Sequence, residues 1–228
     1  VATDGDGRRD DAAAPEASND PAGSRTSTID EIREIYSTQA ARMARLDPVN
    51  RLLTGRYRRR LFEDARGRVL DVACGTAINR RYLPTSTEYV GIDVSPEMLA
   101  EAAARNEGLE LGENLFEMDA GALSFPDDSF ETVVSSLSTC TFPDPAAALR
   151  EMARVCSPDG RILLVEHGRS DVGPIARFQD WRADAHFRKH ACRWTQEPLA
   201  VVAGAGLSVH HAFTGMFGII TAIEAAPT

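Results

Sequence analysis

Three aspartates in this 228-residue chain lie at or just beyond the ends of apolar runs that have the length of buried strands: Asp71, Asp93 and Asp119. A carboxylate in such a place can accept hydrogen bonds from both hydroxyls of a ribose. The first run leads into the small residues Ala73-Cys74-Gly75, which allow the backbone to come close to a ligand. Because ligands of open parallel sheets bind beyond the carboxyl ends of the strands, we expect one nucleoside-binding site here.

The elements that must position these residues alternate regularly from residue 68 onward. Ser95-Pro96 is a good N-cap followed by a residue that suits the first position of a helix. The order predicts an α/β fold, with a Rossmann-like, seven-stranded, mostly parallel sheet, an antiparallel C-terminal hairpin and helices on both faces. The strands are expected at 68–72, 88–92, 115–118, 132–136, 161–165, 207–212 and 219–224.

Local signals predict the intervening segments. A short helix is expected over 78–83 and longer ones over 95–106 and 144–155, with a turn at Ser157-Pro158-Asp159-Gly160. Thr195 is expected to cap a further helix that ends near Gly204.

The N-terminal region divides into two parts. Residues 1–27 are rich in Ala, Asp, Gly, Pro and Ser, which predicts a disordered acidic tail. From Ile29 onward apolar residues recur at helical spacing, and Pro48 is expected to separate a first helix from a second over Val49–Ala65. We therefore expect one domain over 28–228, with two cap helices within 28–65 that become ordered when a ligand binds.

Longer motifs carry a resemblance to a known family. The turn Asp71-Val72-Ala73-Cys74-Gly75-Thr76-Ala77 resembles motif I of the class I S-adenosylmethionine (SAM)-dependent methyltransferases, although Ala77 stands where that family often has Gly. The stretch Leu123–Val134 resembles the segment that leads into their fourth strand, and Leu149–Arg161 resembles the segment before their fifth. The resemblance covers about Ile32–Glu224, and it extends to the ubiquinone/menaquinone C-methyltransferases and methyltransferases of type 11.

The resemblance implies SAM as cofactor, S-adenosylhomocysteine as product, and roles for individual residues. Asp71 would lie near the methionine amino group, Asp93 would bind the ribose, and Asp119 would accept from the adenine amino group. Capping of its own turn is an alternative role for Asp71. Tyr36 would cover the sulfonium, which an aromatic face favours, or else pack in the core. The remaining expected cofactor residues are Ala73, Cys74, Gly75, Val94, Met98, Ala120 and Ser136.

The expected acceptor is a small molecule, and a lipophilic or lipid-like compound is one of the alternatives. His167 follows the fifth strand and has a pKa suited to removing a proton near neutral pH, so it is the candidate general base; a structural hydrogen bond is the alternative. Residues 168–195 are expected to form an acceptor lid, because aromatic and basic side chains alternate there; an amphipathic helix packed on the sheet is equally compatible. The stretch Cys140–Pro145 with Glu166-His167 resembles methyltransferases of small thiols and of phosphatidylethanolamine, and motif I with Asn50–Leu53 resembles the ubiquinone/menaquinone C-methyltransferases.

Composition excludes several other classes. The net charge of −9, from 25 basic and 34 acidic residues, disfavours nucleic acid as a partner. The four cysteines form no CxxC pair and have no zinc spacing, so no metal is expected. Neither a signal peptide nor an apolar run of the ~18 residues that span a bilayer is visible, which predicts a cytoplasmic protein. Arg56–Arg60 is expected to be a solvated helix face, with peripheral contact to an anionic lipid as the alternative.

Two other functions are compatible with the strand-end carboxylates. A nicotinamide-dependent oxidoreductase would also place an acid at Asp93, but the only lysine, Lys189, has no tyrosine four residues before it. A non-catalytic SAM-binding module would be expected to lose its cofactor residues. The sequence does not define the acceptor atom or the oligomeric state.

Overall fold

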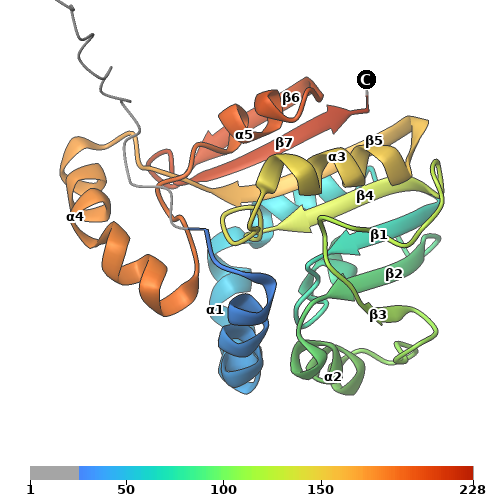
Figure 1. Ribbon diagram of the computed structural model, residues 1–228. Coiled ribbons are helices and arrows are strands. Elements are labelled where there is room, and N and C mark those ends of the chain that lie inside the picture. The colour runs from blue at the N-terminus through green and yellow to red at the C-terminus, as the bar shows by residue number, and fades with distance from the viewer. Residues whose placement is uncertain (1–25, 228) are drawn as a thin grey trace, which may run out of the picture.

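The computed structural model describes residues 26–227, so nearly all of the tail expected over 1–27 lies outside the described residues. One seven-stranded sheet runs through the domain in the order β3-β2-β1-β4-β5-β7-β6 (Figure 1). The strands are β1 (Arg68–Val72), β2 (Glu88–Asp93), β3 (Leu115–Glu117), β4 (Phe130–Ser136), β5 (Cys156–His167), β6 (Ser208–Gly215) and β7 (Ile220–Ala226). The first five are parallel, and β7 is antiparallel to both β5 and β6. The predicted fold class is confirmed.

Helices cover both faces of the sheet, which is why β1, β4 and β5 are apolar on both sides. On one face, α3 (Pro145–Val155) and α5 (Pro198–Gly204) pack on a core that includes Leu70 and Val133. On the other face, α1 (Ile29–Phe62) and α2 (Pro96–Arg105) pack on a core that includes Val69 and Val134. Ligands of such sheets bind where the chain leaves neighbouring strands in opposite directions, here between β1 and β4.

The structure corrects the prediction of two N-terminal helices. Thr28 begins α1 with a capping box to Glu31, and the helix continues through Pro48 to Phe62. Proline inside a helix removes one backbone hydrogen bond and typically bends the helix. Tertiary contacts on both sides of Pro48 offset that loss: Asp47 accepts a hydrogen bond from the Thr76 hydroxyl, and the side chain of Arg58 is buried.

Other boundaries also differ from those expected. The predicted turn at 157–160 belongs to β5, which pairs with β4 through a register shift. The helix expected from Thr195 begins only at Pro198, with Glu197 as its N-cap. The segment 78–83 forms the 3-10 helix η1 (Ile78–Tyr82).

The expected lid contains α4 (Gly173–His190), which projects from the sheet beside α1 (Figure 1). Gln179 ties it to the strand ends, because its side chain accepts from the Ser170 amide and donates to the Gly168 carbonyl. Phe178 and Trp181 are 53% and 74% exposed, so much of the aromatic surface of this helix is not packed on the sheet. No helix among residues 26–227 is long and apolar enough to cross a membrane.

Candidate active site

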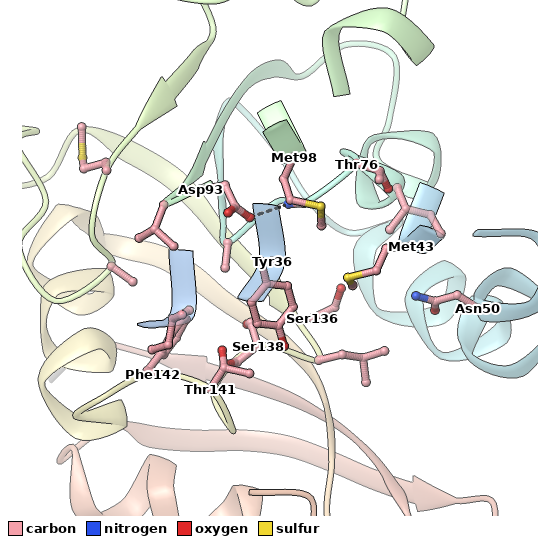
Figure 2. A pocket seen from close by; sticks show the side chains of 18 of the residues that line it. Tyr36, Met43, Asn50, Thr76, Asp93, Met98, Ser136, Ser138, Thr141 and Phe142 are labelled. Carbon is pink, nitrogen blue, oxygen red and sulfur yellow. Dashed lines mark hydrogen bonds between the residues drawn. The ribbon is translucent and has the colours of Figure 1, made fainter. Parts of the chain in front are cut away.

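A cavity of about 310 Å³ opens at the carboxyl ends of β1, β2 and β4, beneath the first half of α1 (Figure 2). Its volume lies at the lower end of the range typical of small-molecule sites. Nine of the predicted cofactor residues line it: Tyr36, Ala73, Gly75, Asp93, Val94, Met98, Asp119, Ala120 and Ser136. Parallel pairing of β1 with β2 and β4 brings these distant segments to one edge of the sheet.

Asp93 is held by two backbone amides at the cavity wall. Its carboxylate accepts from the Gly75 amide at 2.9 Å and from the Ser95 amide at 3.0 Å. Burial raises the pKa of Asp93 to about 6, and the hydrogen bonds to Ser95 and Gly75 oppose that rise. Gly75 has φ +56, and a Cβ there would lie 3.1 Å from the Met98 methyl. A side chain at position 75 would therefore strain this left-handed backbone and crowd the Met98 side chain at the cavity wall.

Asp71 lies beneath the cavity and does not line it. Its carboxylate is fully buried and accepts from the Asn79 amide and the Tyr89 hydroxyl, each at 2.8 Å. Burial raises the pKa of Asp71 to about 7. Cys74 is also buried below the cavity surface. The structure thus brings these two predicted residues next to the site, where they support the loop from below.

Arg58 is a lining residue that the sequence analysis missed. Its side chain is only 1% exposed, although the Arg56–Arg60 run was expected to be a solvated face. Its guanidinium donates to Asn79 at 2.8 Å, Ser136 at 2.9 Å and Asn50 at 2.9 Å, and also contacts Thr54. No carboxylate of residues 26–227 lies within 4.0 Å of it. The available signal was helical spacing, because Arg58 lies four residues before Phe62 on the buried face of α1.

The first half of α1 closes the cavity through polar contacts with other elements. The Tyr36 hydroxyl lies 3.4 Å from the carbonyl of His190, and the Ser37 hydroxyl lies 3.1 Å from that of Ser95. Tyr36 shares the cavity with Ser138 and Thr141, which follow β4 (Figure 2). An aromatic ring, two hydroxyls and the methyl of Thr141 therefore line this part of the cavity.

His167 ends β5, but it does not line this cavity. Its Nε2 lies 3.2 Å from the Cys140 sulfur and 3.4 Å from the Cys192 sulfur. Burial lowers the pKa of His167, but its interactions with Cys192 and Glu166 outweigh burial, so the pKa is raised.

His167 instead lines a second, apolar groove of about 380 Å³. This groove shares Leu46, Asn50 and Leu137 with the first cavity, so the two are adjacent. Its mouth carries Val49 and Leu53, which are 51% and 45% exposed.

Comparison with known proteins agrees with this geometry. Residues 70–164 match the family model of the methyltransferase domain. Over 115 residues, half of this chain, the sequence is 41% identical to a phosphatidylethanolamine N-methyltransferase of Cereibacter sphaeroides. Over 133 residues, 54% of this chain, it is 38% identical to a demethylmenaquinone methyltransferase of Thermus thermophilus. The chain therefore contains a methyltransferase domain and is similar to SAM-dependent methyltransferases over about half of its length. Family and fold together imply SAM as the ligand of the cavity.

Solved methyltransferase structures share the fold of this chain. A chain of a methyltransferase complex from Haloferax volcanii aligns with a TM-score of 0.69 at 20% identity, covering 85% of this chain and 98% of that one. A SAM-dependent methyltransferase from Thermotoga maritima aligns with a TM-score of 0.63 at 17% identity, covering 86% and 99%. The matched regions cover 57% of the Cereibacter protein and 60% of the Thermus protein, a little over half of each.

Proposed function

We propose that this chain transfers a methyl group from SAM to a small, lipophilic acceptor and releases S-adenosylhomocysteine. The observation that carries the proposal is the pairing, in one cavity, of a buried carboxylate and a buried cation. Asp93 provides the acceptor that a ribose needs, and Arg58 provides a guanidinium without a carboxylate partner among residues 26–227. A nucleoside linked to an amino-acid carboxylate satisfies both groups.

The direction of the ligand follows from where these groups lie. Asp93 and Asp119 end neighbouring elements at the β2–β3 side, so the adenosine belongs there. Arg58 and Ser136 lie at the β4 side, so the methionine carboxylate belongs there. Tyr36 closes the cavity from α1, where an aromatic face favours a sulfonium.

Methyl transfer from a sulfonium is an in-line displacement, in which the acceptor forms a bond to the methyl carbon as the carbon–sulfur bond breaks. The sulfonium supplies the reactivity, so the chain must align the acceptor and exclude water. Helix α1 and the residues after β4 line the cavity and can serve both purposes. We assign no proton transfer to His167, because its Nε2 faces two thiols outside the cavity.

The adjacent apolar groove favours a lipophilic acceptor. Its walls are aliphatic apart from a few polar side chains, and it meets the cofactor cavity at Leu137. Exposed apolar side chains at its mouth would otherwise be unfavourable in water. The names of two relatives, which specify phosphatidylethanolamine and demethylmenaquinone, support an acceptor of this class.

Calorimetric titration with S-adenosylhomocysteine tests the cofactor. We expect binding in the micromolar range, a loss of about 10- to 100-fold in Asp93→Ala, and unchanged binding in Asp159→Ala, which removes an exposed carboxylate. A folded wild-type protein that does not bind S-adenosylhomocysteine would contradict the proposal.

The acceptor is tested separately, by following S-adenosylhomocysteine release from SAM with vesicles containing phosphatidylethanolamine, with quinols, and with water-soluble thiols and amines. We expect turnover with a lipophilic acceptor, and a rise in its KM in Leu53→Asp with the affinity for S-adenosylhomocysteine unchanged. Turnover only with the water-soluble compounds, or full activity of Leu53→Asp, would refute the role of the groove while leaving the cofactor assignment intact.

A further inference from the structure

Three residues from distant parts of the chain converge beside the active site. Cys140 follows β4, His167 ends β5, and Cys192 follows α4. The two sulfurs are 3.2 Å apart, and the Nε2 of His167 lies 3.2 Å from one and 3.4 Å from the other. Both thiols are almost fully buried, with 1% and 7% of each residue exposed.

We infer that Cys140, His167 and Cys192 form a binding site for Zn²⁺ that joins the segment after α4 to the ends of β4 and β5. The donor set is one that Zn²⁺ prefers: two thiolates and one imidazole nitrogen, all directed at one point. The site is distinct from the SAM cavity, because none of the three residues lines it.

The distances fit a metal centre after a small expansion. With Zn–S bonds of about 2.3 Å and tetrahedral angles, the two sulfurs would lie about 3.8 Å apart. The observed separation of 3.2 Å must therefore increase by about half an ångström, which side-chain rotation can provide. His186 interacts with Cys192, so it is the candidate for the fourth position.

The near equivalence of the three separations favours a metal over a disulfide. A disulfide would use the two sulfurs alone and leave His167 without a partner for Nε2. Metal binding uses all three atoms: two S–H bonds break, two Zn–S bonds and one Zn–N bond form, and two protons pass to solvent. No oxidant is needed, so the step proceeds in a reducing solution.

The surroundings fix the ligands from outside the cluster. The ring of His167 forms a backbone hydrogen bond with Trp194, the kind of contact that commonly orients a metal-bound imidazole. The backbone amide of Arg193 donates to the carbonyl of Cys140 at 3.0 Å, so two of the loops are already aligned. A metal would thus anchor the lid segment to the sheet. The sequence analysis expected no metal because these ligands are separated by 27 and 25 positions.

Titration of the reduced, metal-free full chain with Co²⁺ tests the inference. We expect one equivalent to bind, with a thiolate-to-cobalt charge-transfer band and the intense visible bands of tetrahedral cobalt, and we expect Zn²⁺ to displace it. In the wild-type protein, bound Zn²⁺ should protect Cys140 and Cys192 from alkylation, as mapped by mass spectrometry. This measurement requires no variant.

Substitutions then identify the ligands. Cys140→Ser, Cys192→Ser and His167→Gln should each weaken Zn²⁺ binding by more than the about 10- to 100-fold that loss of an outer-shell partner costs. Cys156→Ala is the matched control, because Cys156 is equally buried but lies outside the cluster, and it should bind as the wild type does. Absence of stoichiometric binding, lack of a thiolate band, or unchanged affinity in Cys192→Ser would overturn the proposal.

Discussion

Replacement of Arg58 by Met should weaken the binding of ligands that carry the methionine carboxylate and leave the binding of the nucleoside part nearly unchanged. Four of the five N–H groups of Arg58 donate to Asn79, Ser136, Asn50 and Thr54, which leaves one N–H of its outer nitrogen for a ligand. A hydrogen bond to a charged group contributes about 1.5–3 kcal/mol. Its loss corresponds to a decrease of about 10- to 150-fold in affinity for S-adenosylhomocysteine.

The assay compares two ligands by calorimetry. S-adenosylhomocysteine contains the carboxylate, whereas 5′-methylthioadenosine retains the adenosine but lacks it. We expect Arg58→Met to weaken binding of the first ligand by the factor above and to change binding of the second less than about threefold, roughly 0.6 kcal/mol. Arg58→Lys should be intermediate, because an ammonium retains the charge but not the planar fork.

The matched control is Arg59→Met, which removes an exposed arginine from the next position of the same helix. It should leave both affinities unchanged. Met also has a volume close to that of Arg, so the replacement leaves no large cavity, and circular dichroism establishes that the variant is folded. Equal loss of both ligands in a folded Arg58→Met protein, or no loss of either, would refute the assignment of Arg58 to the carboxylate.

Three further predictions follow from the buried acids and from α1. Burial raises the pKa of Asp93 to about 6, so the affinity for S-adenosylhomocysteine, measured by calorimetry, should fall as the pH decreases from 7.5 to 5. Asp93→Asn should bind S-adenosylhomocysteine weakly at both pH values. A wild-type affinity that does not change with pH would contradict this prediction. Asp71 has its pKa raised from 3.8 to about 7, so its contribution to stability is greatest below pH 4 and is lost as pH rises through 7, by at most ~4 kcal/mol. The free energy of unfolding in urea should therefore fall from pH 5 to pH 8 by more in the wild type than in Asp71→Asn, and equal changes would refute it. Limited proteolysis should cut residues 29–47 faster than 49–62, with S-adenosylhomocysteine protecting the first segment; protection independent of ligand would count against this.

The last of these predictions rests on how differently the two halves of α1 are held. After Pro48, the helix buries Tyr57, Leu61 and Phe62 in one of the two cores. Before Pro48 the helix buries Ile32, Ala40 and Ala44, none of which belongs to either core. Its further contacts include the ion pair between Arg33 and Glu117, whose side chains are about half exposed. Exposed ion pairs contribute little to stability. The first half is therefore the part that can move to admit a ligand, with Pro48 between it and the anchored half.

The strands and the place of the cavity were predictable because they depend on local signals. Apolar runs of strand length, the Ser95-Pro96 cap and the small residues around Gly75 each have one simple structural interpretation. Once the strands are parallel, their carboxyl ends must meet, and Asp93 and Asp119 come together without any further information. The resemblance to family motifs in the same segments then favours SAM as the ligand of that edge.

Sequence patterns could not identify residues whose role depends on packing between distant segments. Pro48 was expected to end a helix because proline has no backbone N–H to donate within a helix. The contact of Asp47 with Thr76 nevertheless holds this part of α1 in place, and the helix continues through Pro48. The resemblance to motif I placed Asp71 beside the ligand. In the structure Asp71 lies within β1, before the last residue of the strand, and its carboxylate lies beneath the cavity. In each case tertiary contacts decide between two structures that are locally acceptable.

Arg58 and the cysteine cluster show the same limit for functional groups. In the sequence, Arg58 is one of a run of arginines, and only burial of a single helix face distinguishes it from its exposed neighbours. Cys140 and Cys192 are far apart in sequence and become neighbours because the lid segment returns to the end of β5. A buried guanidinium without an ionic partner is a costly arrangement for an isolated chain. Buried thiols are not, because free cysteine packs as a small apolar group, so the cation site rests on the convergence of two sulfurs with an imidazole nitrogen. An anion bound at Arg58 and a cation bound at the cluster are the ligands that would account for these two arrangements.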